Sequence, residues 1–143
     1  MALRCGVFKV TRVVVNKARR EMLLLSGDSV VRSYLVALGR EPSGHKVAEG
    51  DGRTPEGIYT IDRRNPKSKY HLSLHISYPN ALDCERARAL GVEPGGDIMI
   101  HGLKTGAAHP ETDWTQGCIA VTDAEMEEIW DLVRDGTAIE INP

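Results

Sequence analysis

The chain has 143 residues, of which 41% are hydrophobic and 27% are charged, and these proportions fit one globular domain covering residues 1–143. The formal net charge of −2 argues against a nucleic-acid partner, because nucleic-acid-binding proteins usually present a basic face. No apolar run approaches the roughly 20 residues that a membrane-spanning helix needs. Residues 1–10 lack the apolar segment and cleavage site of a signal peptide. Two locations follow from this: the cytoplasm, or an exported location reached with a leader that this chain lacks.

The cysteines are Cys5, Cys84 and Cys118. An odd number leaves at least one thiol free, and no C-x-x-C pair indicates a metal site. Only the number of cysteines suggests a disulfide between Cys5 and Cys84, and no other feature of the sequence supports one. We therefore predict a chain with no metal and no cofactor.

Most of the chain is predicted to form short β-strands. β-branched and apolar residues gather in segments that turn residues separate, as in antiparallel meanders. An irregular loop at 39–55, rich in glycine and charge, interrupts them and is long enough to be functional. The predicted strands are 7–16, 21–25, 30–38, 58–61, 70–78, 98–101 and 138–141, with a turn at 65–68.

The segment 70–78 alternates strictly between apolar and polar residues, which is typical of a half-buried strand. The apolar face is predicted to contain Tyr70, Leu72, Leu74, Ile76 and Tyr78. The polar face is predicted to contain His71, Ser73, His75 and Ser77.

Two short helices are expected. The first spans 81–90 and ends at Gly91, with Leu82, Ala89 and Leu90 as its packed side. The second follows the capping box formed by Thr122 and Glu125. Its apolar residues recur at i, i+3, i+4 and i+7, which buries Met126, Ile129, Trp130 and Val133.

The stretch from 98 to 121 contains the most informative pattern in the chain. An apolar run ends at His101, a polar loop follows, and Cys118 begins a second apolar run. A nearby imidazole makes a thiolate available for nucleophilic attack, and Gly117 permits close backbone approach and offers an N–H to an oxyanion. From spacing alone, a buried, inert cysteine explains Cys118 equally well.

The segments that surround this pattern resemble the L,D-transpeptidase catalytic domain, the YkuD-like family. The family signature is His-Gly, a loop of similar length, and Ser/Thr-His-Gly-Cys; here the residues are His101-Gly102 and Thr115-Gln116-Gly117-Cys118. T-P-E-G-I-Y at 54–59 and G-T-A-I-E-I at 136–141 resemble its other conserved segments, so that the resemblance spans nearly the whole chain. The segments I-S-Y-P-N and G-G-D-I-M-I-H-G are most similar to the YafK-like branch.

The resemblance implies a β-sandwich of mixed sheets with two short helices packed at its edges. It implies chemistry on peptidoglycan stem peptides, in which Cys118 attacks the carbonyl at the L-centre of meso-diaminopimelate and a thioester forms. His101 is then the base, and the carbonyl of Gly102 orients its ring. Carbapenems are the expected inhibitors, the periplasm or cell envelope the expected location, and a monomer the expected state.

Two positions depart from the family pattern. Gln116 replaces a histidine and cannot act as an acid or base, and Ala120 replaces an arginine or asparagine. Three outcomes stay open: transfer to an amine, hydrolysis of diaminopimelate-linked bonds, and peptidoglycan binding without catalysis.

The residues predicted to line the substrate groove are His75, Tyr78, Trp114, Thr115 and Gln116. A zinc site using His71, His75, His101 and Cys118 is disfavoured, because their spacing fits no compact ligand pattern.

Overall fold

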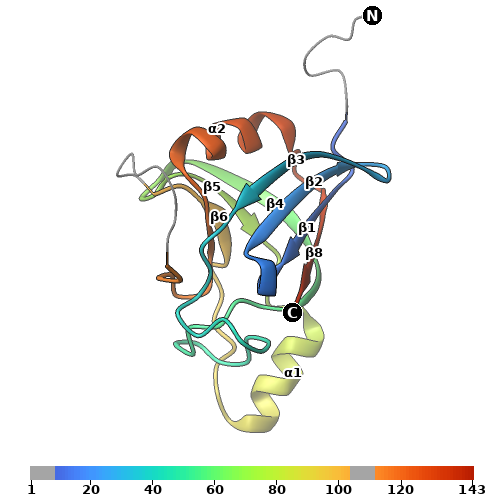
Figure 1. Ribbon diagram of the computed structural model, residues 1–143. Helices are drawn as coiled ribbons and strands as arrows, with labels where there is room; N and C mark the ends of the chain where they lie inside the picture. Colours follow the sequence, from blue (N-terminus) through green and yellow to red (C-terminus); the bar gives the residue numbers. More distant parts are fainter. Residues whose placement is uncertain (1–8, 104–111) are drawn as a thin grey trace, which may run out of the picture.

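The computed structural model describes residues 9–103 and 112–143, and it confirms a mainly β fold with two helices (Figure 1). The amino-terminal part contains β1 (Arg12–Asn16), the 3-10 turn η1 (Lys17–Arg19), β2 (Glu21–Ser26) and β3 (Ser29–Leu35). The remaining elements are β4 (Gly57–Ser68), β5 (His71–Ile76), α1 (Ala81–Leu90), β6 (Met99–His101), β7 (Ile119–Ala120), α2 (Asp123–Leu132) and β8 (Ala138–Asn142).

The strands form one curled, eight-stranded sheet in the order β3-β2-β1-β8-β4-β5-β6-β7. The sheet is mixed, as predicted, because β1 pairs with β8 and β6 with β7 in parallel, whereas the other pairs are antiparallel. The long strand β4 pairs first with β8 and then with β5, so it belongs to both halves of the sheet. The two halves thereby enclose a common core, as the layers of a sandwich do.

Apolar side chains from both halves meet in that core. Val13 and Leu24 come from β1 and β2, Leu74 and Ile100 come from β5 and β6, and all four are fully buried. Side chains of this size, once buried, each stabilise the fold by about 2–5 kcal/mol relative to alanine.

The helix α2 lies over one end of the sheet, and its capping box and the burial of its core residues are confirmed except at Trp130 (Figure 1). Thr122 and Glu125 form the capping box, and Met126 and Ile129 are fully buried. Trp130 packs against the core while remaining partly exposed, with the guanidinium of Arg64 4.7 Å from its ring centroid.

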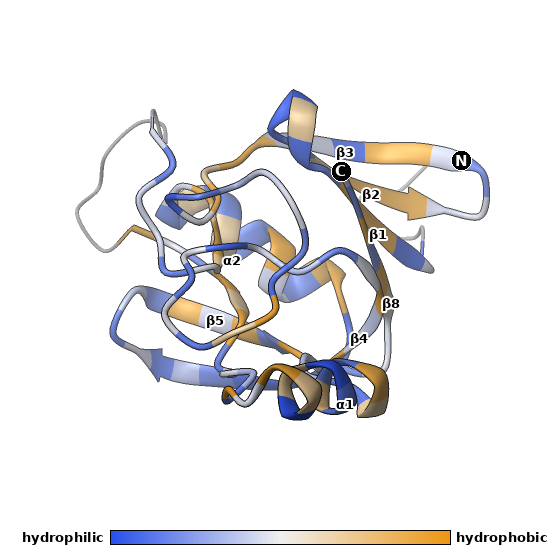
Figure 2. Ribbon diagram, turned by 90° about the horizontal axis from the view of Figure 1, so that it is seen from below, coloured by the Kyte–Doolittle hydropathy of each residue, from blue (hydrophilic) through white to orange (hydrophobic). Residues whose placement is uncertain are grey.

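The helix α1 lies at the opposite end of the molecule from α2, and its predicted bounds and its Gly91 cap are confirmed. The predicted packed side is wrong, because Leu82 and Leu90 are 51% and 63% exposed. Apolar and polar residues are mixed along α1, as Figure 2 shows. The helix is instead fixed by buried Ala87 and by Asp83, which accepts hydrogen bonds from Tyr59 Oη and His45 Nε2.

Three strand predictions need correction. Residues 65–68 continue β4 through register shifts instead of forming a turn. The strand predicted at 30–38 ends at Leu35, after which Ala37 and Gly39 make isolated bridges to Ala120 and Thr115. Ser73 is buried, although it belongs to the polar alternation of β5, because other parts of the chain cover that face near His101.

Candidate active site

The candidate site is built on one face of β5, β6 and the start of β7. Ser73 is the register partner of His101, which is in turn the partner of Ala120. Two residues along both strands, His75 pairs with Met99, and the parallel register of β6 and β7 places Met99 beside Cys118. Register partners share a sheet face. His101 and Cys118 therefore lie on one face, on adjacent strands, two positions apart along them.

The imidazole of His101 is held in a single orientation. Nδ1 lies 2.7 Å from the carbonyl oxygen of Gly102. A carbonyl only accepts hydrogen bonds, so Nδ1 carries the proton and Nε2 is left as the base. The residue is only 3% exposed, and this burial lowers the pKa of His101, which keeps the ring neutral at pH 7.

Two aromatic rings cover His101. Tyr70 stacks on the imidazole with ring centroids 4.4 Å apart and an interplanar angle of 20°, and Trp114 lies 5.8 Å from it. Trp114 is 38% exposed, so it can also face a ligand, as its predicted groove role requires. The sequence pattern placed Tyr70 on the apolar face of β5, and so its contact with the candidate base was missed.

The thiol of Cys118 is partly exposed and donates a hydrogen bond to the Asp97 carbonyl, with 3.3 Å between sulfur and oxygen. Burial raises the pKa of Cys118 to about 11, although the nearby backbone of Met99 acts in the opposite direction. In the described part of the chain the thiol thus faces Asp97 rather than His101.

The turn before Cys118 depends on Gly117 and Thr115. Gly117 has φ of 136°, and a Cβ at this position would lie 2.7 Å from the Arg53 carbonyl oxygen. The hydroxyl of Thr115 accepts a hydrogen bond from the Gly117 N–H and donates one to the Cys118 carbonyl. Thr115 is buried and sets the shape of this turn. The N–H of Gly117 is therefore occupied within the turn.

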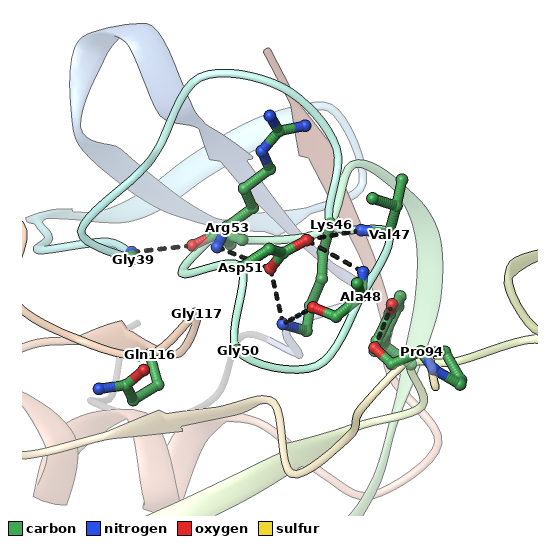
Figure 3. Close-up of polar contacts among 12 residues, drawn as sticks. Gly39, Lys46, Val47, Ala48, Gly50, Asp51, Arg53, Pro94, Gln116 and Gly117 are labelled. Atoms are coloured by element: carbon green, nitrogen blue, oxygen red, sulfur yellow. Dashed lines mark hydrogen bonds and ion pairs between the residues drawn. The ribbon is translucent and has the colours of Figure 1, made fainter. Parts of the chain in front are cut away.

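The loop at 39–55 lies against this turn, as Figure 3 shows. Asp51 organises it by accepting hydrogen bonds from the N–H groups of Val47, Ala48 and Arg53 and by pairing with buried Lys46. Burial opposes ionisation, but the backbone donors and Lys46 lower the pKa of Asp51 to about 2. The charge of Lys46 also acts on the Cys118 thiol, in the direction that lowers its pKa.

Gln116 is exposed and is bound to the same loop. Arg40 donates a short hydrogen bond to Gln116 Oε1 and a second, 3.0 Å long, to the Gly50 carbonyl. The amide at this position thereby links the loop to the turn that precedes Cys118. Ala120, the other departure from the family pattern, is fully buried and packs in a small cluster with Ala37 and Leu103.

An ion pair between Arg20 and Asp113 restrains the residue that precedes Trp114. Arg20 contacts both carboxylate oxygens of Asp113, at 2.7 to 3.1 Å, and Asp113 also accepts a hydrogen bond from the Leu38 N–H. Bidentate pairs of this kind restrict geometry as well as adding energy. The two residues are 93 positions apart in sequence, and no local pattern pairs them.

The remaining predicted residues lie in two different environments. His75 is on the site face, and its Nδ1 is 2.6 Å from Asp62 Oδ1. Tyr78 is buried in the core, and its hydroxyl donates to the Pro94 carbonyl, so it does not line the site face. Gly102 lies where a Cβ would meet the Asp123 carboxylate.

No group of three or more histidine, cysteine or acidic side chains gathers to hold a metal within residues 9–103 and 112–143. His71 pairs with Glu127 instead of joining His75. Cys84 and Cys118 are free thiols, and Cys5 lies outside the described residues. No helix in the described ranges is long and apolar enough to cross a membrane.

Comparison with known proteins gives a consistent result. The model of the YkuD family, described as the L,D-transpeptidase catalytic domain, matches residues 10–141. The "Putative L,D-transpeptidase YafK" of Escherichia coli K12 is 36% identical over 103 residues, which are 71% of this chain and 36% of that protein.

Solved structures share the fold. The helical cell shape determining protein Pgp2 of Campylobacter jejuni superposes with a TM-score of 0.73 at 26% identity, over 94% of this chain and 48% of that one. An L,D-transpeptidase from Xylanimonas cellulosilytica gives a TM-score of 0.63 at 17% identity, over 99% and 64%. The chain thus spans about a third of the YafK protein and about half of Pgp2.

Proposed function

The chain belongs to the L,D-transpeptidase catalytic-domain family, and from this premise we propose that it performs cysteine-dependent acyl transfer on peptidoglycan stem peptides. The observation that carries the proposal is the shared sheet face of Cys118 and His101, with His101 Nε2 left as the base by the bond between Nδ1 and Gly102.

In the proposed first step, His101 Nε2 takes the thiol proton and the sulfur attacks the carbonyl at the L-centre of meso-diaminopimelate. The low pKa of the buried imidazole ensures that the base is neutral when substrate arrives. The Cys118 N–H stabilises the oxyanion. The tetrahedral intermediate collapses, the leaving amine takes the proton from His101, and a thioester remains on Cys118.

An amine or water then resolves the thioester, so that transfer and hydrolysis share their first half. We propose the cell envelope as the site of action, since its peptidoglycan is the substrate. Binding of peptidoglycan without catalysis is the alternative, and one observation favours it. The thiol has a pKa of about 11 and donates to Asp97 rather than to His101.

The test is incubation with a carbapenem, followed by mass spectrometry of the intact protein and of its peptides. We expect one covalent adduct at Cys118, lost in Cys118→Ala and retained in Cys84→Ala, the matched control that removes the other described free thiol. Incubation of wild-type protein with peptidoglycan sacculi should release or exchange stem peptides. Binding to sacculi by Cys118→Ala, with no adduct and no turnover in the wild type, would establish the non-catalytic alternative.

A further inference from the structure

A second histidine on the site face is paired with a carboxylate. His75 Nδ1 donates a hydrogen bond of 2.6 Å to Asp62 Oδ1, and the side chains are 11% and 38% exposed. The bond fixes the tautomer, because an ionised carboxylate only accepts. Nε2 of His75 is the nitrogen left open for a ligand, and it makes no hydrogen bond to any residue that the structure describes.

The backbone of β4 is irregular at the point where it delivers this carboxylate. Ile61 pairs with Ile76, and Arg63 pairs with His75, so that Asp62 is one extra residue in the ladder. A bulge of this kind redirects a side chain, and bulges are frequent beside active sites. Here the redirected side chain is the one that orients His75.

The register places His75 in the same row as the nucleophile. His75 is the partner of Met99 on β6, and the parallel register of β6 and β7 places Met99 beside Cys118 on the next strand. Two strand spacings separate the backbones of His75 and Cys118 by roughly 10 Å. An acyl carbon on the sulfur and an attacking atom beside it fit within that span.

We propose that His75 is a second catalytic base, which activates the acceptor that resolves the thioester, and that Asp62 positions it. The proposal rests on the proposed function of Cys118. Nε2 of His75 takes a proton from the acceptor amine or water as its lone pair attacks the thioester carbon. The new C–N or C–O bond forms, the C–S bond breaks, and the sulfur leaves as thiolate. Solvent returns a proton to the thiolate and removes one from His75, so each turnover is balanced.

The environments of the two histidines agree with these separate roles, His101 in forming the thioester and His75 in resolving it. His101 is 3% exposed beneath Tyr70 and Trp114 and serves the thiol and the leaving amine. His75 lies across Met99 from Cys118, and the proposal places the acceptor on that side of the thioester.

The experiment separates the two half-reactions with a muropeptide that contains a tetrapeptide stem. Rapid quenching and mass spectrometry give the rate of thioester formation on Cys118 and the fraction of protein acylated at steady state. In His75→Gln we expect an unchanged rate of thioester formation, accumulation of the thioester and turnover reduced about 10²–10⁴-fold, as for loss of a general base. Asp62→Asn should show the same pattern with a smaller loss.

The matched control is His71→Gln, which removes a histidine from the same strand that is also paired with a carboxylate, that of Glu127. It should behave as wild type. Hydroxylamine, a strong nucleophile that needs little base catalysis, should discharge the thioester of His75→Gln at the wild-type rate. A merely structural role for His75 would slow that discharge as well.

Unchanged steady-state acylation in His75→Gln, or a failure of hydroxylamine to discharge its thioester, overturns the assignment of His75 alone. Absence of any thioester in the wild type overturns the proposed function and this inference with it.

Discussion

The two faces of β5, β6 and β7 are made from alternate residues of the same strands, yet they differ in the kind of contact that their side chains make. The inner face presents Leu74, Ile100 and Ile119, fully buried in the common core. The outer face presents His75, His101 and Cys118, whose polar atoms bind particular carbonyl and carboxylate groups. On the inner face, the shape and volume of the side chains determine how well they pack. On the outer face, hydrogen-bond geometry determines how the side chains are oriented. Substitutions at neighbouring residues should therefore alter stability and site chemistry separately.

The largest effect on stability is expected from the inner face. Ile100→Ala should lower the free energy of unfolding by about 2–5 kcal/mol, because it leaves a cavity in the core. Met99→Ala, at the adjacent, partly exposed outer position, should cost clearly less. Urea denaturation of both variants measures the difference. Equal losses would show that the outer face is packed as tightly as the core.

A smaller effect, read as a rate, is expected from the thiol of the outer face. The thiolate fraction rises tenfold per pH unit below the pKa, and burial has raised the pKa of Cys118 to about 11. Alkylation of Cys118 by iodoacetamide in the free protein should therefore accelerate about tenfold per unit between pH 7 and 10. Peptide mass spectrometry gives the rate at each pH. A rate that levels off near pH 7 would mean that the thiol is already paired with His101 as an ion pair.

The smallest effect on the free energy of unfolding is expected at Ser73, a polar residue that is buried on the outer face. Its hydroxyl is buried beside His101, and no residue in the described ranges forms a hydrogen bond with it. Ser73→Ala should thus change the free energy of unfolding by less than about 1 kcal/mol, or increase it.

Thr122→Ala is the matched control for Ser73, because it removes a buried hydroxyl that caps α2 and should cost about 1 kcal/mol. Thermal unfolding of both variants gives the comparison. A loss at Ser73 as large as that at Thr122 would mean that the serine hydroxyl has a stabilising partner.

The sequence was sufficient wherever a local pattern determines the outcome. The capping box of Thr122 and Glu125 predicted α2, the apolar alternation predicted core strands, and the H-G and G-C pairs predicted that His101 and Cys118 lie on neighbouring strands. These features depend on residues a few positions apart, because interactions within one helical turn or one strand determine them.

The features that were missed depend on register and on distant contacts. Tyr70 reaches His101 only because the chain turns at the start of β5, and Asp62 reaches His75 only through a bulge in β4. Arg20 and Asp113 meet across the fold, with no signal in either neighbourhood. A shift of one residue reverses the face of every side chain in a strand, and periodicity alone does not reveal where such a shift occurs.

The place of β8 in the sheet has a consequence for how the chain acquires its structure. β8 is synthesised after all the other strands, yet it lies between β1 and β4 and is hydrogen-bonded to both. Until β8 leaves the ribosome, no strand can join β1–β3 to β4–β7, and the edges of β1 and β4 lack the partner that they have in the folded sheet. Folding must then close contacts between residues more than a hundred positions apart, which is slow. A chaperone that shields the exposed edge of β1 would protect the nascent chain for this interval.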